Sequence, residues 1–143
     1  MRKIKFRGKR IDQDEWVVGS LVKIIRVNIK FYILPLNTVI DDDSKMFDSL
    51  IEIRPETASQ FTGLVDRNGK EVYEGDILET KYEDRCEESG FGIARNGVSF
   101  KIGCFGTIGE ITREFLPFSD YPIKDEYIIG NIHENPELLN EKQ

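Results

Sequence analysis

The stretch TGLVDRNGKEVYEGDILE, residues 62–79, decides the fold more than any other part of the chain. At its centre stands the pair Asn68 and Gly69, two residue types that supply the positive φ angles of a tight β-hairpin turn. Apolar pairs flank this turn on both sides, at residues 64–65 and 72–73. The stretch therefore predicts a turn followed by a strand at the centre of a β-rich domain.

A second tight turn is predicted directly after the first, at Glu74, Gly75 and Asp76, and it leads into a strand that continues to Tyr82. With Glu71, these acids form a cluster, and paired carboxylates can perform general acid and base catalysis when burial separates their pKa values. Short acids also accept backbone hydrogen bonds in tight turns. We interpret Asp76 in this second way, and catalysis by the cluster is the alternative.

The N-terminal third has the pattern of a three-stranded meander within residues 1–33. Ile4 and Phe6 alternate with basic residues, so we expect a strand that turns these two side chains to the core. A second strand is predicted from Trp16, with a bend or break at Gly19. A β-branched and aromatic run predicts the third strand over residues 24–33.

The middle of the chain is predicted to be less regular. Residues 35–50 indicate an exposed loop whose run of Asp41, Asp42 and Asp43 is a weak candidate for a cation site, because the alternating oxygen ligands and the glycine of a calcium loop are missing. We interpret the run as a solvated acidic loop. Residues 51–53 predict a short strand, and Pro55 predicts a helical turn over residues 57–61.

Further strands are predicted in the C-terminal half. A second hairpin is expected to turn at Asn96 and Gly97, between residues 91–94 and 98–102. Other strands are expected at residues 108–112 and 127–129, and a short helix should begin at Asn135 and Pro136. Together these elements predict one domain over residues 1–143 of the all-β class, a small SH3-like, partly open barrel with an added N-terminal β-meander.

The charge of the chain is unevenly distributed. The net charge is −6, but residues 1–30 carry nine Lys or Arg against three acids, and the rest carries eleven against twenty-three. Such asymmetry can mark a nucleic-acid surface or a contact between subunits, and solvated basic strand faces are the plainer interpretation. The candidate contacts for nucleic acid or a partner are Lys3, Lys5, Arg7, Lys9 and Arg10.

Other site classes lack the residues they need. No apolar run reaches the roughly 18 residues of a membrane helix, and no signal peptide is recognisable, which predicts a cytoplasmic protein. Cys86 and Cys104 do not require a disulfide, although a single one between them stays open. Either of them could pair with His133 as a nucleophile and base, but we prefer a His133 that packs where an aromatic would. We expect no structural metal, no phosphate-binding loop and no cofactor.

Three blocks of the sequence together resemble a known family. These blocks are KIKFRGKRID with EWVVGSL, the central IRPETASQFTGLVDRNGKEVYEGDILE, and YIIGNIHENPELL. They resemble the YopX-like proteins of bacteriophages and prophages in Gram-positive bacteria. The family pattern more often has Gly at Ser59, and Tyr at Phe61 and His133, and we expect a helical turn and an aromatic packing site to tolerate those changes.

The resemblance implies a β-rich fold with an SH3-like portion, and a phage or prophage origin in a bacterial host. It implies no activity, because the family has no established catalytic residues to transfer. We therefore expect a non-enzymatic accessory protein that acts through protein contacts, with itself or with another protein. The alternative is a nucleic-acid-binding module that uses the basic N-terminal strand. We expect neither a membrane nor a small-molecule substrate as a partner.

Overall fold

The structure, a computed structural model, describes residues 1–83, 90–109 and 113–140. Its strands pair antiparallel in two sheets, which confirms the all-β class. The helical elements are short 3-10 turns. In chain order the elements are β1 (Phe6–Lys9), β2 (Trp16–Ile25), β3 (Ile29–Pro35), η1 (Asp43–Lys45), η2 (Phe47–Ser49), β4 (Ile51–Ile53), η3 (Pro55–Thr57), β5 (Ser59–Val65), β6 (Glu71–Tyr73), β7 (Asp76–Glu83), β8 (Phe91–Lys101), β9 (Cys104–Gly109), β10 (Phe115–Pro117), β11 (Tyr127–Asn131) and η4 (Pro136–Leu139).

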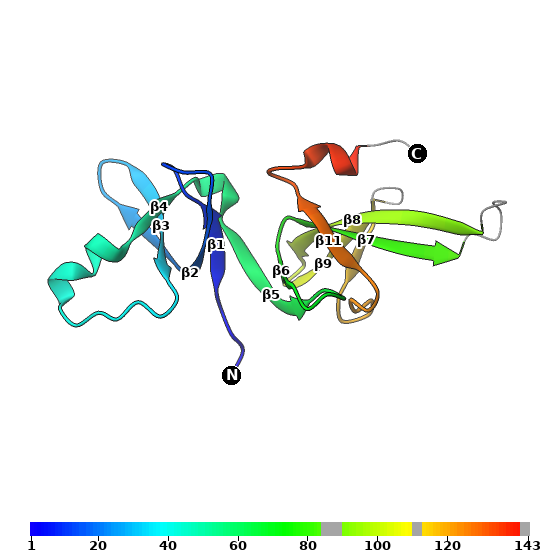
Figure 1. The fold of residues 1–143 in the computed structure, drawn as a ribbon, viewed down its shortest axis with the longest axis horizontal. Helices are drawn as coiled ribbons and strands as arrows, with labels where there is room; N and C mark the ends of the chain where they lie inside the picture. Colours follow the sequence, from blue (N-terminus) through cyan, green and yellow to red (C-terminus); the bar gives the residue numbers. More distant parts are fainter. Residues whose placement is uncertain (84–89, 110–112, 141–143) are drawn as a thin grey trace. The chain divides into compact units, whose positions relative to one another are not determined.

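The chain divides into two compact units, Met1–Phe61 (unit 1) and Thr62–Gln143 (unit 2). Strand β5 runs through the boundary between them. The first sheet has the order β4-β3-β2-β1-β5-β6, and the second has the order β10-β9-β8-β7-β11 (Figure 1). A single domain over residues 1–143 stays a prediction.

Unit 1 confirms the predicted meander of β1, β2 and β3. The predicted bend at Gly19 is wrong, because β2 continues through this residue and the chain turns at residues 26–28. Gly19 serves a close approach instead: a Cβ atom there would lie 1.9 Å from the carbonyl oxygen of Leu34. A glycine without positive φ thus marks tight strand packing, not a turn.

The expected orientation of Ile4 is also wrong. Strand β1 begins only at Phe6, Ile4 is exposed, Phe6 is half-buried, and the buried positions of the strand are Gly8 and Lys9. The core at this place is supplied by other strands, since a Cβ on Gly8 would lie 2.3 Å from the Cδ1 atom of Ile53. The alternation of apolar and basic residues assigns the wrong face of β1 to the core. The small Gly8 instead leaves room for the large side chain of Ile53 from β4.

The sheet of unit 1 curls back towards its own edge. The backbone N–H of Arg54 donates to the carbonyl oxygen of Lys9 at 2.8 Å, and that of Ile11 donates to Glu52 at 3.1 Å. Arg10 also forms an isolated bridge with Ile53. Within the described residues neither sheet closes into a barrel, and a specific likeness to SH3 barrels stays a prediction.

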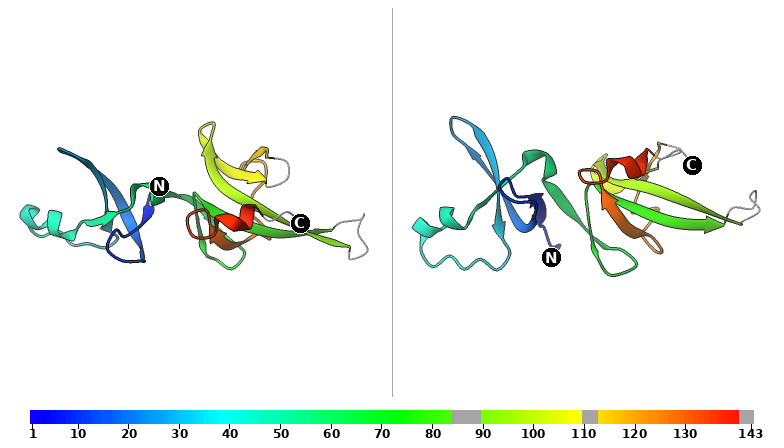
Figure 2. Two further views of the ribbon diagram at one scale, coloured as in Figure 1. Left: turned by 90° about the horizontal axis from the view of Figure 1, so that it is seen from above. Right: turned by 45° about the horizontal axis from the view of Figure 1, so that its top comes forward.

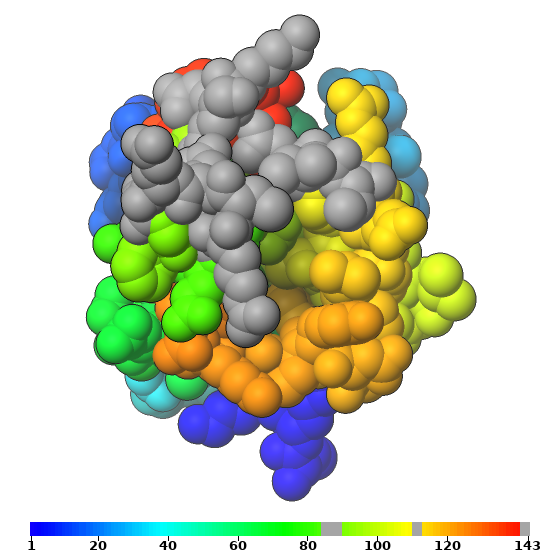
Figure 3. Space-filling model, turned by 90° about the vertical axis from the view of Figure 1, so that its right-hand side faces the viewer, coloured from blue at the N-terminus to red at the C-terminus, as the bar shows by residue number. Residues whose placement is uncertain are grey.

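Unit 2 is built around the hairpin that the central stretch predicts. Its core cluster consists of Val72, Leu78 and Val98. Three partly buried apolar residues pack against this cluster, and the connection between β10 and β11, coloured orange in Figure 3, supplies two of them. Strands β7 and β8 run side by side in all views of Figures 1 and 2. The three partly buried residues that pack against the core cluster are Phe118, Ile123 and Ile128.

The predicted turn at Asn96 and Gly97 is wrong. Strand β8 runs straight through this pair, and both residues have ladder partners in β7 and in β9. The hairpin instead turns at Ile102 and Gly103, whose φ angles are +53° and +79°. Two consecutive positive φ angles characterise a type I′ turn, for which Asn-Gly is favoured and a β-branched residue is strained.

Four predicted elements remain: one helical turn, two strands and the C-terminal helix. The helical turn ends at Thr57, and Ser59 already begins β5, so the prediction of a helix over residues 57–61 is wrong. The predicted strand at 108–112 is found earlier, as β9, and residues 110–112 lie outside the described part. The last strand and the short C-terminal helix are confirmed as β11 and η4.

Candidate functional site

The charged residues of the central stretch fix its backbone. Oδ1 of Asp66 accepts hydrogen bonds from the backbone N–H groups of Asn68 at 2.9 Å and Lys70 at 2.8 Å, and Oδ2 accepts one from Ile128 at 3.0 Å. Burial of Asp66 opposes its ionisation, but these three donors outweigh it and hold its pKa below the usual value. Asp66 therefore ties the hairpin turn to β11, a role that the sequence interpretation missed.

Two carboxylates of the cluster around Tyr73, those of Asp76 and Glu71, also have structural partners. Oδ2 of the buried Asp76 accepts the backbone N–H of Tyr73 at 2.8 Å, which confirms the predicted turn role. The Tyr73 hydroxyl donates to Glu71 at 3.0 Å. None of the three grooves described below is lined by Glu71, Glu74 or Asp76.

A polar network that the sequence did not indicate lies on the sheet of unit 2. The Tyr127 hydroxyl donates to Oε1 of Glu79 at 2.8 Å, and Nε of Arg95 donates to Oε2 at 3.1 Å. Burial opposes ionisation of Glu79, but these two donors and the Arg95 charge hold its pKa low. The same hydrogen bond raises the pKa of Tyr127. Strand pairing explains the network, since Glu79 lies opposite both Arg95 and Tyr127.

The C-terminal NIHENP segment is organised by Asn131. Its side-chain oxygen accepts the backbone N–H groups of His133 and Glu134, both at 3.0 Å, and its amide donates to the Glu134 carboxylate at 2.8 Å. Cys104 carries a free thiol that donates to the Lys101 carbonyl at 3.4 Å. Cys86 lies outside the described residues, so a pairing that involves it stays a prediction.

The five basic candidates do not present equal charge to solvent. Lys9 is buried and forms an ion pair with Asp14 at 2.5 Å. Arg10 makes two hydrogen bonds with Asp12, at 2.9 and 2.8 Å. Two more cover aromatic rings: the Lys5 ammonium lies 4.7 Å from the centre of the Phe61 ring, and the Arg7 guanidinium lies 4.6 Å from that of Trp16. Lys3 is exposed.

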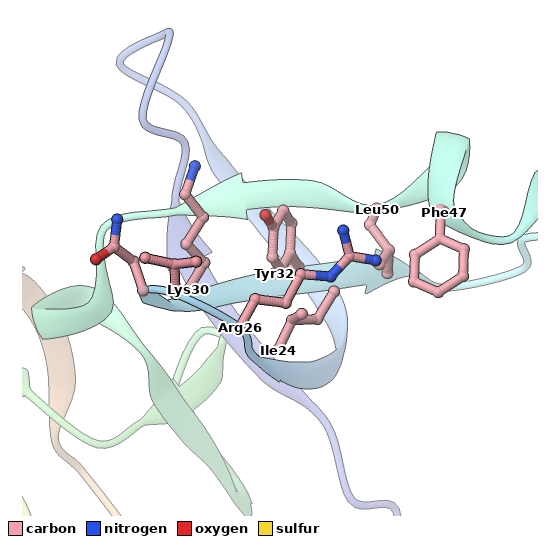
Figure 4. A pocket seen from close by; sticks show the side chains of 8 residues that line it. Ile24, Arg26, Lys30, Tyr32, Phe47 and Leu50 are labelled. Atoms are coloured by element: carbon pink, nitrogen blue, oxygen red, sulfur yellow. The ribbon is translucent and has the colours of Figure 1, made fainter.

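A concave surface of unit 1, here called the hairpin groove, lies on the β2–β3 hairpin and has a volume of about 540 Å³. Figure 4 shows Ile24, Lys30 and Tyr32 on the two strands, with Phe47 and Leu50 on the segment that leads into β4. The register places Ile24 opposite Lys30, so both side chains lie on one face. The complete lining is Ile24, Arg26, Val27, Asn28, Lys30, Tyr32, Phe47 and Leu50.

The charges at this groove are only partly compensated. Lys30 pairs with Glu52, with an N–O distance of 3.1 Å, and the hydrogen bond raises the pKa of Lys30. No acid of the described chain forms an ion pair with Arg26, which reaches over the strands from the turn (Figure 4). The groove therefore combines an apolar floor with uncompensated positive charge.

The tip of the same hairpin, residues 25–29, exposes apolar side chains. Val27 is 99% exposed, and Ile25 and Ile29 are exposed on its two sides. The sequence interpretation missed this tip because it placed one continuous strand over residues 24–33. Asn28 in the run Arg26-Val27-Asn28 was the available turn signal.

The described residues of unit 2 also line grooves. One of about 520 Å³ includes Lys101, Arg113 and Leu139 in its lining, and one of about 260 Å³ is lined by Arg67, Lys81, Asp125 and Tyr127.

Clusters of metal-ligating residues and long apolar helices are the two remaining features to consider in the described ranges. No group of three His, Cys, Asp or Glu side chains in them is placed to hold a metal ion. Asp42 of the acidic run caps η1, because its Oδ1 accepts the Ser44 backbone N–H at 2.9 Å. Among the described helices none has the length and apolar content that crossing a bilayer requires.

Comparisons with known proteins agree with this architecture. The crystal structure of protein EF1440 from Enterococcus faecalis is similar, with a TM-score of 0.55 and 25% sequence identity, over 97% of this chain and 99% of that one. A search among curated proteins found no match. The family model described as YopX protein matches residues 5–140 and thus extends over both units. Since this match covers nearly the whole sequence, the chain belongs to the YopX family.

Proposed function

We propose that this YopX-family chain is a non-enzymatic accessory protein of a phage or prophage, active in the bacterial cytoplasm, and that it acts by contacting protein through the β2–β3 hairpin. The observation that carries the proposal is the concentration of exposed apolar residues at the hairpin tip, beside the hairpin groove. Exposed apolar residues gathered at one place are typical of protein interaction sites.

The composition of the surface supports a protein partner. Interface cores are enriched in aromatic residues and Arg, and the hairpin groove contains Tyr32, Phe47 and Arg26. In contrast, Asp66 and Asp76 of the central stretch accept backbone hydrogen bonds in its turns. A role in recognition therefore accounts for more of the exposed residues than a role in catalysis.

The proposal is tested by recovering tagged protein from cells that carry the natural gene. The wild-type chain should copurify with a defined protein, a second copy included, and the double variant Ile25→Ser with Val27→Ser should lose it. Ile102→Ser is the matched control, because Ile102 is 93% exposed at a different hairpin tip. Equal recovery by all three proteins would contradict a contact through the β2–β3 hairpin.

The second candidate is nucleic-acid binding by the N-terminal strand, favoured by the basic excess of residues 1–30. Three of the predicted basic contacts, Lys3, Lys5 and Arg7, lie at the start of this segment. Titration of labelled single-stranded and duplex DNA at low salt tests it. Binding that is abolished in the triple variant of these residues to Glu would support this candidate, and absence of binding by the wild type would exclude it.

A further inference from the structure

We propose that the hairpin groove receives the segment Val39–Asp43 of a second copy of the chain, and that two such contacts form a symmetric dimer. This inference rests on the proposed function and names the partner of the same surface. Both the groove and the segment belong to unit 1, so the contact needs no particular placement of unit 2.

The segment combines apolar side chains with the negative charge that the groove lacks. Val39 is 86% exposed and Ile40 is 39% exposed, and three aspartates follow directly. In the described chain, Asp41 and Asp43 form no ion pair, just as Arg26 forms none. An apolar pair followed by carboxylates therefore matches an apolar floor beside a free guanidinium, in both hydrophobicity and charge.

The conformation of the segment suits a docking role. It lies in the long connection between β3 and β4, whose residues 41–43 are all exposed. Asp42 caps η1 through Ser44, which fixes the end of the segment without using Asp41 or Asp43.

A two-fold arrangement follows from charge. If two hairpin grooves faced each other directly, Arg26 and Lys30 of both copies would repel across the interface. If each groove instead receives the acidic segment of the other copy, both contacts are attractive and identical. Such reciprocal pairing is the definition of an isologous interface.

The test measures molar mass by light scattering on the full chain at about 100 μM, in the range where micromolar association is resolved. At low salt we expect about twice the 16.5 kDa of one chain. The mass should fall towards 16.5 kDa at about 1 M salt, where the Debye length is only about 3 Å. Arg26→Glu, and separately the pair Asp41→Lys with Asp43→Lys, should each weaken the dimer at least about tenfold.

The decisive experiment reverses the charges on both sides of the proposed contact in one protein. Combining Arg26→Glu with Asp41→Lys and Asp43→Lys should restore the dimer, which loss of folding could not do. Lys101→Glu, an exposed position on β8, is the matched control and should leave the mass unchanged. A monomer at all salt concentrations, or a dimer insensitive to these variants, would overturn the inference. The proposed function would survive that result if the tagged chain still recovered a different protein through the β2–β3 hairpin.

Discussion

At the scale of single residues, Asp66 is the clearest case of a charged group that holds the fold together. Its two oxygens accept three backbone N–H groups, and one of these, from Ile128, lies 62 positions away in the sequence. A carboxylate satisfied in this way is costly to remove, because three backbone donors lose their partner as well.

Asp66→Ala should lower the free energy of unfolding by about 3 kcal/mol, since three backbone donors lose a buried, charged acceptor. Asp66→Asn should cost less, because Oδ1 can still accept from Asn68 and Lys70 and only the bond from Ile128 is lost. Urea denaturation measures both changes, with Asp125→Asn as an exposed control. If the alanine variant were as stable as the control, the assigned role would be wrong.

Acidification should destabilise the protein through Asp66 and Glu79. Their folded-state pKa values are held below those of the unfolded chain, so the stability they contribute is present above about pH 4. It is lost as the pH falls through the folded-state values. Denaturation midpoints measured between neutral and acid pH should decline in that window. The double variant Asp66→Asn with Glu79→Gln should show a flatter decline, and an unchanged decline would contradict this assignment.

Residue roles could be predicted where the partner is near in sequence. The bond from Tyr73 to Asp76 spans three positions, and the turn pattern indicated it. In the network of Glu79 the partners are 16 and 48 positions away, and only strand register brings them together. Local pattern contains no information on that register, so the network could not be predicted.

At the scale of elements, the turn between β8 and β9 contains local strain. Ile102 has φ +53°, a left-handed conformation that a β-branched side chain rarely adopts. Its side chain is almost fully exposed, so it gains little from burial. The position favours Asn, which tolerates this conformation better.

Ile102→Asn should therefore raise the free energy of unfolding by about 1 kcal/mol. Gly97→Ala should be nearly neutral, because Gly97 has no positive φ and the new methyl group would meet only the Cδ1 atom of Leu139 at 3.4 Å. Thermal unfolding of both variants checks the pair. If the turn instead lay at Asn96 and Gly97, the alanine variant would be the strongly destabilised one.

The elements show where turn chemistry is a sufficient guide. Asn68 and Gly69 do form a turn, because the backbone of Asp66 pairs with that of Lys70 and closes the loop. Asn96 and Gly97 have the same chemistry but lie between two strands that both pair with them. Tertiary pairing on both sides overrides the local preference, and the turn moves to Ile102 and Gly103.

At the scale of the whole molecule, the all-β class and the family were predictable from the sequence. The match over residues 5–140 agrees with the three blocks that carried the resemblance. The hairpin groove was not predictable, because Leu50 and Phe47 reach it from a connection that reads only as an irregular loop. The uneven charge was visible in the sequence. The ion pairs of Lys9 and Arg10 could not be read from it, nor could the position of Arg26 at the hairpin groove.

The most direct test of a protein contact through the β2–β3 hairpin is site-specific photo-crosslinking in the native cells. A photoreactive residue replaces Val27 in one protein and Ile102 in another, since both are almost fully exposed at hairpin tips. We predict one defined protein adduct from position 27 and none from position 102. Adducts from position 102 alone, or from neither position, would contradict the account.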